Sequence, residues 1–369
     1  GFAPAFTLSL CDSECSRKPP VPIASVVMPH FKKNMKKILV DINNSKISLI
    51  TGGKGCLSGI NGITENVDSV FRIQFSSIPD LTLLKEVTEI IKINPQISLR
   101  FYGNFSEDLI KWEELKSVQR LFIDLWETKN LEGLRNLTQL KRLGISKNVK
   151  TTVNLNVIEN LNELEMFFTS ISKGIESASK LKNLQFISLN EIKSDSLDFL
   201  SENTNLSTVW ISFGSIKDIS SINEIQNLKT LSVHQLRGFN HLIANSILSK
   251  CLQLEKLELM NLKDICQLNF LEQAKNLTTL NLEGLKNIES YHVIRNNIKL
   301  KTISGYDCRP QDKSLFGLEN IESVTLGDSY SKSEIDAFTK RFNGENLWIR
   351  GKQIIGQKSV GGRIAILND

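Results

Sequence analysis

The sequence contains little that could form an enzyme active site or a metal centre. Only four histidines are present, and none has a spacing of the H-E-x-x-H kind. The six cysteines are scattered, without the spacing of a zinc site or a disulfide framework. No serine or cysteine stands in a nucleophile motif. We therefore predict a protein that is not an enzyme and that uses no metal and no cofactor.

One glycine-rich segment, Thr51-Gly52-Gly53-Lys54-Gly55, invites comparison with a phosphate-binding loop. It lacks the G-x-x-x-x-G-K-[ST] order in which backbone amides surround a phosphate. Two interpretations stay open, a flexible turn and phosphate binding, and the missing order favours the turn. An enzyme with its site in residues 35–66 is the corresponding alternative function.

Long apolar runs are also absent. No stretch of about 18 apolar residues occurs, so the sequence predicts no membrane span. The apolar start, Gly1 to Leu10, lacks the basic region of a secretory signal. Scattered cysteines are typical of buried thiols in a reducing compartment. We expect a cytoplasmic location, and secretion stays open.

Charge is low over most of the chain. The formal net charge is +5, and the first 37 residues carry six lysines and arginines against Asp12 and Glu14, which is +4 of that total. The rest is close to neutral, which argues against a nucleic-acid partner bound through phosphate neutralisation.

The chain does contain an apolar ladder, Leu-x-x-Leu-x-x-Leu-x-Leu, that recurs every 20 to 26 residues. Clear copies are Leu181, Leu184, Ile187 and Leu189; Leu254, Leu257 and Leu259; and Leu277, Leu280 and Leu282. The alternation at the end of each copy indicates a short strand, and apolar steps of three before it indicate a compact 3₁₀-like return. A single unit cannot bury its apolar faces, so about a dozen units must stack into a solenoid.

At these residues the chain resembles the leucine-rich repeat family, in its 22-residue bacterial internalin-like and SDS22-like class. The copy from Ser215 to Val233 is close to the class pattern, and the resemblance covers roughly residues 67 to 350. It implies an α/β horseshoe with parallel inner strands, short helical or 3₁₀ returns outside, and a bacterial protein that binds protein partners. The buried asparagine ladder of the family is mostly missing: Asn148 fits, but Ile192, Gly214, Leu236, Leu262 and Leu285 occupy equivalent places. We therefore expect less regular turns.

The repeats need caps, because the ends of a solenoid expose apolar surface. We predict an N-terminal cap over 35–66 with a hairpin at Asn43-Asn44-Ser45, repeats over 67–330, and a C-terminal cap over 331–360 with a helix opened by Ser333. Helices are expected behind Pro79 and behind Ser106. Residues 1–34 are proline-rich and out of phase, and we interpret them as a leader, an upstream translated segment or an expression remnant. Residues 361–369 form a tail.

Strand alternation also predicts which side chains leave the core. Large apolar residues at such positions are unusual on a surface and favoured at interfaces. The candidates for partner binding are Phe122, Met166, Phe168, Phe186, Trp210 and His234. Three interpretations stay open: a contact surface, aromatics that pack on one another, and a phase error of one residue near Phe167 and Phe168.

The predicted function is a non-enzymatic module that binds a protein partner through the concave surface, as a scaffold, effector or immunity-type regulator. The alternative is a recognition domain that senses a small ligand or glycan, which would need a deep pocket with converging polar groups.

Overall fold

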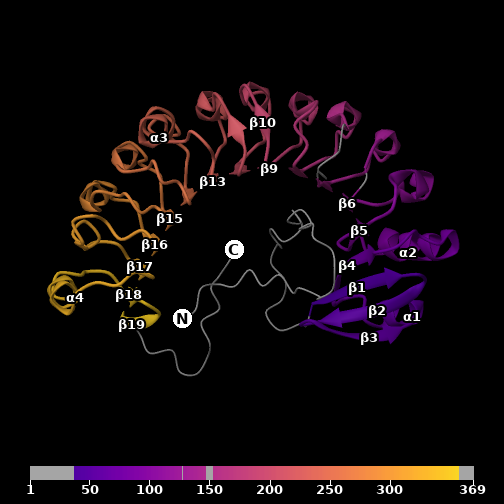
Figure 1. Cartoon of the computed structure of the whole chain (residues 1–369), viewed down its shortest axis with the longest axis horizontal. Helices are drawn as coiled ribbons and strands as arrows, with labels where there is room; N and C mark the ends of the chain where they lie inside the picture. The colour runs from indigo at the N-terminus through magenta and orange to yellow at the C-terminus, as the bar shows by residue number, and fades with distance from the viewer. Residues whose placement is uncertain (1–36, 127, 147–152, 357–369) are drawn as a thin grey trace.

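The structure is a computed structural model that describes residues 37–126, 128–146 and 153–356. The predicted segment 1–34, the predicted tail 361–369 and Asn148 lie outside these ranges. The chain forms a leucine-rich-repeat solenoid bent into an arc, with strands along the inside and helices along the outside (Figure 1). The predicted fold class is confirmed.

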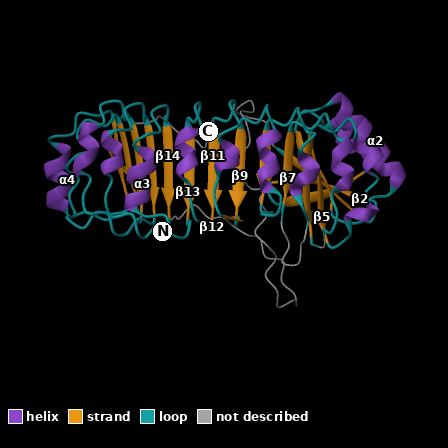
Figure 2. Cartoon of the chain, turned by 90° about the horizontal axis from the view of Figure 1, so that it is seen from above, coloured by secondary structure: helices purple, strands orange, loops and turns teal. Residues whose placement is uncertain are grey.

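One sheet of 17 strands runs through the described residues, and viewed from above its strands lie side by side behind the helices (Figure 2). Its pairs are parallel from β1–β4 to β17–β18 and antiparallel at both ends. In spatial order the strands are β3 (Lys54–Ser58), β2 (Lys46–Thr51), β1 (Ile38–Asn43), β4 (Val70–Phe75), β5 (Ser98–Gly103), β6 (Arg120–Leu125), β7 (Arg142–Ile145), β8 (Met166–Thr169), β9 (Phe186–Asn190), β11 (Thr208–Ser212), β13 (Thr230–His234), β14 (Lys256–Met260), β15 (Thr279–Glu283), β16 (Thr302–Tyr306), β17 (Ser323–Leu326), β18 (Asn346–Ile349) and β19 (Lys352–Ile355). A separate pair joins β10 (Lys193–Ser194) to β12 (Ser215–Ile216).

Short helices return the chain along the outer side, and most are single 3₁₀ turns, as the steps of three predicted. They are α1 (Ile60–Glu65), α2 (Leu81–Ile93), η2 (Glu107–Leu109), η3 (Trp112–Leu115), η4 (Glu132–Asn136), η5 (Leu155–Ile158), η6 (Ile175–Lys180), η7 (Asp198–Leu200), η8 (Ser220–Glu224), α3 (His241–Leu248), η9 (Asn269–Glu272), η10 (His292–Asn296) and α4 (Lys332–Thr339). The α-helix α3 was not predicted. It occurs where the repeat lengthens from 22 residues (Val209 to Leu231) to 26 (Leu231 to Leu257).

Of the two helices predicted near the N-terminus, one forms and the other is divided into two 3₁₀ turns. The helix behind Pro79 forms as α2, begins after Asp80 and buries Leu84, Val87 and Ile91. The helix behind Ser106 is instead split into η2 and η3. Ile110 between them has extended backbone and is 3% exposed. An apolar side chain that must enter the core at this point interrupts the helix.

The ladder residues form one continuous core that follows the sheet. Leu257, Leu280 and Ile303 are aligned neighbours on β14, β15 and β16 and are at most 1% exposed. The strand register therefore repeats the sequence register, and each repeat buries its apolar side chains against the next.

The turns after the strands are more regular than the missing asparagines led us to expect. Glu191, Phe213, Gln235 and Asn261 each follow a strand with a positive φ between 46° and 55°. Their backbone N–H groups donate to the last strand residue of the next repeat at 2.7–2.8 Å. This backbone ladder gives the four turns the same geometry, so the expectation of irregular turns was wrong for these repeats.

Hairpins lie at both ends of the arc. At the N-terminal end, β1 and β2 pair around Asn44 and Ser45, as predicted. At the C-terminal end, α4 begins after Ser331, whose hydroxyl accepts the Glu334 N–H at 3.1 Å, and not at the predicted Ser333. The last parallel strand, β18, is followed by β19, which pairs with it antiparallel.

Candidate functional site

The concave surface consists of the side chains that alternate with the buried ladder. Strand pairing aligns Arg142, Met166 and Phe186 in one row. It aligns Gly144 with Phe168 in the next. Phe167 belongs to the main core and is 0% exposed, whereas Phe168 lies in a separate cluster. The predicted register is correct, and a phase error at this point is excluded.

Five of the six predicted contact residues come together, and we call them the aromatic cluster: Phe122, Met166, Phe168, Phe186 and Trp210. The centroid of the Phe168 ring is 4.9 Å from that of Phe186 and 6.1 Å from that of Phe122. The Phe186 and Trp210 rings meet edge to face at 5.1 Å. These separations are in the range of favourable aromatic pairs. The rings therefore pack on one another across β6 to β11.

Gly144 on β7 makes this packing possible. A Cβ atom at Gly144 would lie 2.3 Å from Cδ1 of Phe122, closer than any real contact. The Phe122 ring occupies the space that a side chain on β7 would fill. It can therefore reach Phe168, two strands away.

Packing leaves the members of the aromatic cluster unequally accessible. Phe122, Phe168 and Phe186 are 4%, 1% and 7% exposed, and Met166 and Trp210 are partly exposed. Of the interpretations that the sequence left open, packing of the aromatics on one another describes the three phenylalanines, because each ring is enclosed by its neighbours. The indole Nε1 of Trp210 is buried without a hydrogen-bond partner among the described residues. A buried donor left unpaired is unfavourable.

His234, the sixth predicted contact residue, lies beside the aromatic cluster and not in it. Its ring packs against the Phe213 ring at a tilt of 52°, with centroids 4.7 Å apart. Its Nε2 lies 3.0 Å from the side-chain amide nitrogen of Asn261. Burial lowers the pKa of His234, which favours the neutral ring that can accept a hydrogen bond from this amide.

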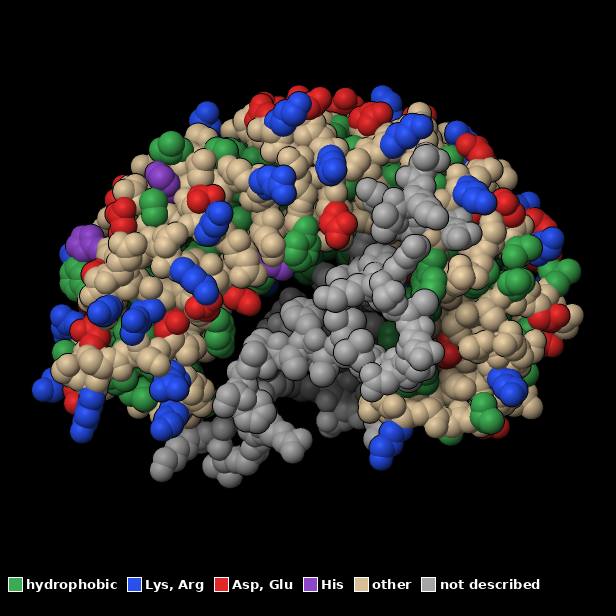
Figure 3. Space-filling model, in the orientation of Figure 1, with side chains coloured by type: hydrophobic (Ala, Val, Ile, Leu, Met, Phe, Trp, Pro, Cys, Tyr) green, Lys and Arg blue, Asp and Glu red, His purple; other side chains and the backbone are tan. Residues whose placement is uncertain are grey.

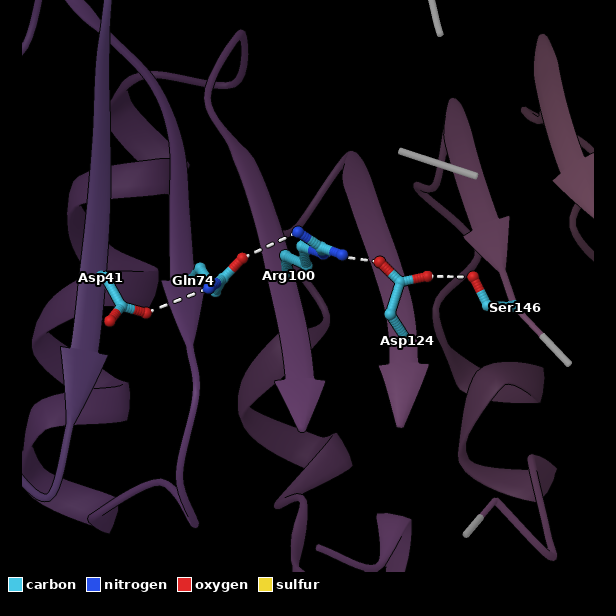
Figure 4. Close-up of polar contacts among 5 residues, drawn as sticks. All are labelled: Asp41, Gln74, Arg100, Asp124 and Ser146. Atoms are coloured by element: carbon cyan, nitrogen blue, oxygen red, sulfur yellow. Dashed lines mark hydrogen bonds and ion pairs between the residues drawn. The ribbon is translucent and has the colours of Figure 1, made fainter. Parts of the chain in front are cut away.

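A chain of polar side chains runs from β1 to the end of β7 and overlaps the first strands of the aromatic cluster, and Figure 4 shows its five members, Asp41, Gln74, Arg100, Asp124 and Ser146. The Gln74 amide donates to Asp41 at 3.0 Å. Arg100 donates through Nη1 to Gln74 at 2.9 Å and through Nε to Asp124 at 2.5 Å. The Ser146 hydroxyl donates to the other Asp124 oxygen. The Arg100 and Asp124 side chains are only 10% and 5% exposed, so this ion pair is shielded from water.

Two further arginines on this surface have no ion pair with a described residue. Arg72 on β4 lies over the Phe122 ring, 4.7 Å from its centroid. Arg142 on β7 donates to the Met166 sulfur at 2.9 Å and lies 5.6 Å from the Phe168 ring centroid. Burial, then repulsion from Arg100, lowers the pKa of Arg72 to about 10. Burial, then repulsion from Arg120, lowers the pKa of Arg142 to about 10.

Arg72 and Arg100 were not among the predicted contact residues, although the sequence held the information. The apolar pairs Ile73/Phe75 and Leu99/Phe101 are buried at 0–1% exposure, so the same alternation places Arg72, Gln74 and Arg100 on the concave side. The ladder is harder to recognise there because phenylalanine replaces leucine at its last position.

In the C-terminal half of the concave surface, polar and charged side chains form hydrogen bonds and an ion pair with one another. Glu258 accepts from the Asn281 amide at 2.9 Å and pairs with Lys256 at 3.1 Å. Ser304 donates to the other end of the Asn281 amide at 2.6 Å. This half is therefore ordinary polar surface with charges of both signs, like the side of the solenoid that Figure 3 shows.

The glycine-rich segment at Thr51–Gly55 has a structural role. Gly52 and Gly53 form the turn between β2 and β3, with φ of 56° and 83°. This turn leads into a strand and not into the helix that a phosphate-binding loop needs. Among the described residues, no three His, Cys, Asp or Glu side chains gather closely enough to hold a metal ion. No helix in the described ranges has the length and apolar character to cross a membrane.

No protein-family model matches the sequence, and no curated protein matches it. The chain is similar to a solved internalin, inlF, from Listeria monocytogenes, with a TM-score of 0.44 and 15% identity over 70% of this chain and 79% of that one. It is similar to internalin C2 from the same species, with a TM-score of 0.36 and 20% identity over 46% and 74% of the two chains. The PEPR1–AtPEP1 complex gives a TM-score of 0.41 and 16% identity over 76% of this chain and 45% of that one. The periodic ladder and the register of the parallel strands show that the chain has the leucine-rich-repeat fold.

Proposed function

We propose that this protein is a non-enzymatic interaction module that binds a protein partner through the N-terminal half of its concave surface, from β4 to β13. The observation that carries the proposal is the aromatic cluster, a set of large apolar side chains packed outside the main core. Rigid, clustered aromatic residues supply much of the affinity of protein interfaces from few positions. Met166 and Trp210 are the members that a partner can reach, and His234 lies at the rim.

A sensor of a small ligand or glycan is the second candidate. Such a site gathers polar groups around a deep pocket. The aromatic cluster instead extends across β6 to β11 and is bordered by arginines. An extended strip of this kind favours a protein partner.

The test is capture of partners from a lysate of the source cells by the immobilised protein. We expect Trp210→Ala and Met166→Ala each to reduce capture about tenfold or more, as interface anchors do. Tyr306→Ala is the matched control, because Tyr306 is a 37% exposed aromatic side chain on β16, away from the aromatic cluster. Unchanged capture by both cluster variants would reject the proposal.

Stability must be measured alongside capture. Phe168 is 1% exposed, so Phe168→Ala removes a buried ring and is expected to cost about 3–5 kcal/mol. The single variants at Met166 and Trp210 are therefore decisive. The double variant Trp210→Ala/Phe168→Ala is informative only where far-UV circular dichroism shows that it is folded.

A further inference from the structure

The concave surface between β4 and β9 carries an excess of positive charge. Its outward positions hold four arginines, Arg72, Arg100, Arg120 and Arg142, and one carboxylate, Asp124. Subtracting the one negative charge from the four positive charges leaves +3. The sequence as a whole carries only +5, so this strip is far more basic than the average surface.

Only part of this charge is balanced within the protein. Arg100 is neutralised by Asp124, and Arg120 donates to the backbone oxygen of Gln96. Arg72 and Arg142 are 8% and 7% exposed and form no ion pair with a described residue, and Nε of Arg72 is buried without a partner among them. One N–H group of Arg142 donates to the Met166 sulfur, which is a weak acceptor. A guanidinium group has planar N–H donors that match the two oxygens of a carboxylate, and neither Arg72 nor Arg142 has such a partner among the described residues.

Both guanidinium groups are held in place by the aromatic cluster. Arg72 lies over the ring of Phe122 and Arg142 over the ring of Phe168. Cation–π contacts orient the groups and limit the side-chain entropy that binding would otherwise cost. Met166, which touches Arg142, joins this charged strip to the accessible apolar members of the cluster.

We propose that the partner contributes an acidic segment with a neighbouring apolar side chain, whose carboxylates bind Arg72 and Arg142 while the apolar group packs on Met166 and Trp210. The inference rests on the proposed function and names the chemistry of the partner. Arg72 and Arg142 lie three strands apart, which is roughly 14 Å. An extended peptide spans that distance in about four residues. Two acidic residues at this separation would engage both arginines.

A single-stranded nucleic acid would also bring negative charge, but the surface fits it less well. Such strands bind by stacking bases on open aromatic faces. The three phenylalanine rings pack against one another, with centroids 6.1 and 4.9 Å apart, so neighbouring rings occupy the faces that a base would need. The carboxylates of a protein segment are therefore the better match.

The test measures fluorescence anisotropy with a labelled synthetic peptide that has two glutamates about four residues apart and leucine and phenylalanine beside them. Three further probes accompany it: the same peptide with glutamine for glutamate, the same peptide with serine for its apolar residues, and a single-stranded oligothymidine. We expect the glutamate peptide to bind the parent protein best and the other three at least about tenfold more weakly. The binding should weaken as salt is raised, because it depends on charge.

The protein variants are Arg72→Gln and Arg142→Gln, each expected to weaken binding of the glutamate peptide about tenfold. Arg237→Gln is the matched control, because Arg237 is an exposed arginine outside β4–β9. Equal binding of the glutamine peptide, unchanged binding by both variants, or oligothymidine binding as tight as that of the glutamate peptide would each overturn the inference. So would a failure of the glutamate peptide to bind.

The two proposals can fail separately. If lysate capture depends on Trp210 but no glutamate peptide binds, the interaction module stands and the acidic segment is rejected. If capture is also indifferent to Trp210 and Met166, the interaction surface itself is rejected. Two single arginine variants, rather than one, keep the test valid where either disturbs the fold.

Discussion

Two arginines on neighbouring strands, Arg72 and Arg100, should respond in opposite ways to replacement by methionine. Arg72 is 8% exposed and has no carboxylate partner in the described part of the chain, whereas Arg100 is paired with Asp124 and Gln74. Methionine keeps much of the side-chain volume and removes the charge. We expect Arg72→Met to stabilise the protein and Arg100→Met to destabilise it.

The magnitudes follow from the surroundings of each charge. Burial lowers the pKa of Arg72 from its ordinary value to about 10, which corresponds to about 3 kcal/mol of unfavourable free energy for the charged form. The contact with the Phe122 ring offsets about 1–2 kcal/mol of this. Arg72→Met should therefore raise the free energy of unfolding by about 1–2 kcal/mol. Arg100→Met leaves a buried carboxylate without its cation and should lower it by about 3–5 kcal/mol.

The sign of the pH dependence determines the pH at which the stabilities of the variants should be compared. The pKa of Arg72 is lower in the folded state than in the unfolded chain, so from about pH 10 up to the ordinary pKa of arginine the unfolded chain binds more protons. The unfavourable contribution is present in full at neutral pH and disappears only as the pH rises through that window. Comparison at pH 7 is therefore the correct condition.

The assay is urea unfolding at pH 7, followed by circular dichroism, with midpoints compared between variants of equal slope. Arg237→Met, an exposed arginine, is the control and should stay within about 0.5 kcal/mol of the parent. If Arg72→Met lowers the midpoint as far as Arg100→Met does, Arg72 has a structural partner. Its role as an unpaired charge kept for binding would then be refuted.

Three further predictions concern packing and reactivity. Gly144→Ala should displace the Phe122 ring and weaken partner capture, and capture equal to the parent would show that this ring can move without consequence. Leu257→Ala should cost about 2–5 kcal/mol in urea unfolding by opening a cavity, and an unchanged midpoint would contradict its place in the core. Burial raises the pKa of Cys251 to about 12, so iodoacetamide at pH 8 should label exposed Cys56 and spare Cys251 in the native protein. Mass spectrometry measures both labels, and equal labelling rates would count against the buried thiol.

The fold was predictable because the ladder carries two periodicities at once. Strand alternation placed Phe167 inside and Phe168 outside, and the structure agrees at both positions. The steps of three predicted the 3₁₀ returns. Prediction was less successful at Ile110, where a residue that enters the core divides an expected helix in two.

The candidate site was predictable only in part. Alternation identified Met166, Phe168 and Trp210 as outward residues, but it could not show that Phe168 would be enclosed by other rings. That depends on which residues stacking brings together from repeats more than 20 positions apart. It also depends on Gly144, whose missing side chain admits the Phe122 ring.

The sequence by itself determined the solenoid, the register of its strands and the identity of the outward side chains, because all three follow from the spacing of apolar residues along one chain. Only the tertiary structure decided that Arg100 pairs with a carboxylate while Arg72 and Arg142 have none within residues 37–126, 128–146 and 153–356. The balance of charge on a surface depends on distances between side chains of different strands. Those distances exist only once the repeats are stacked.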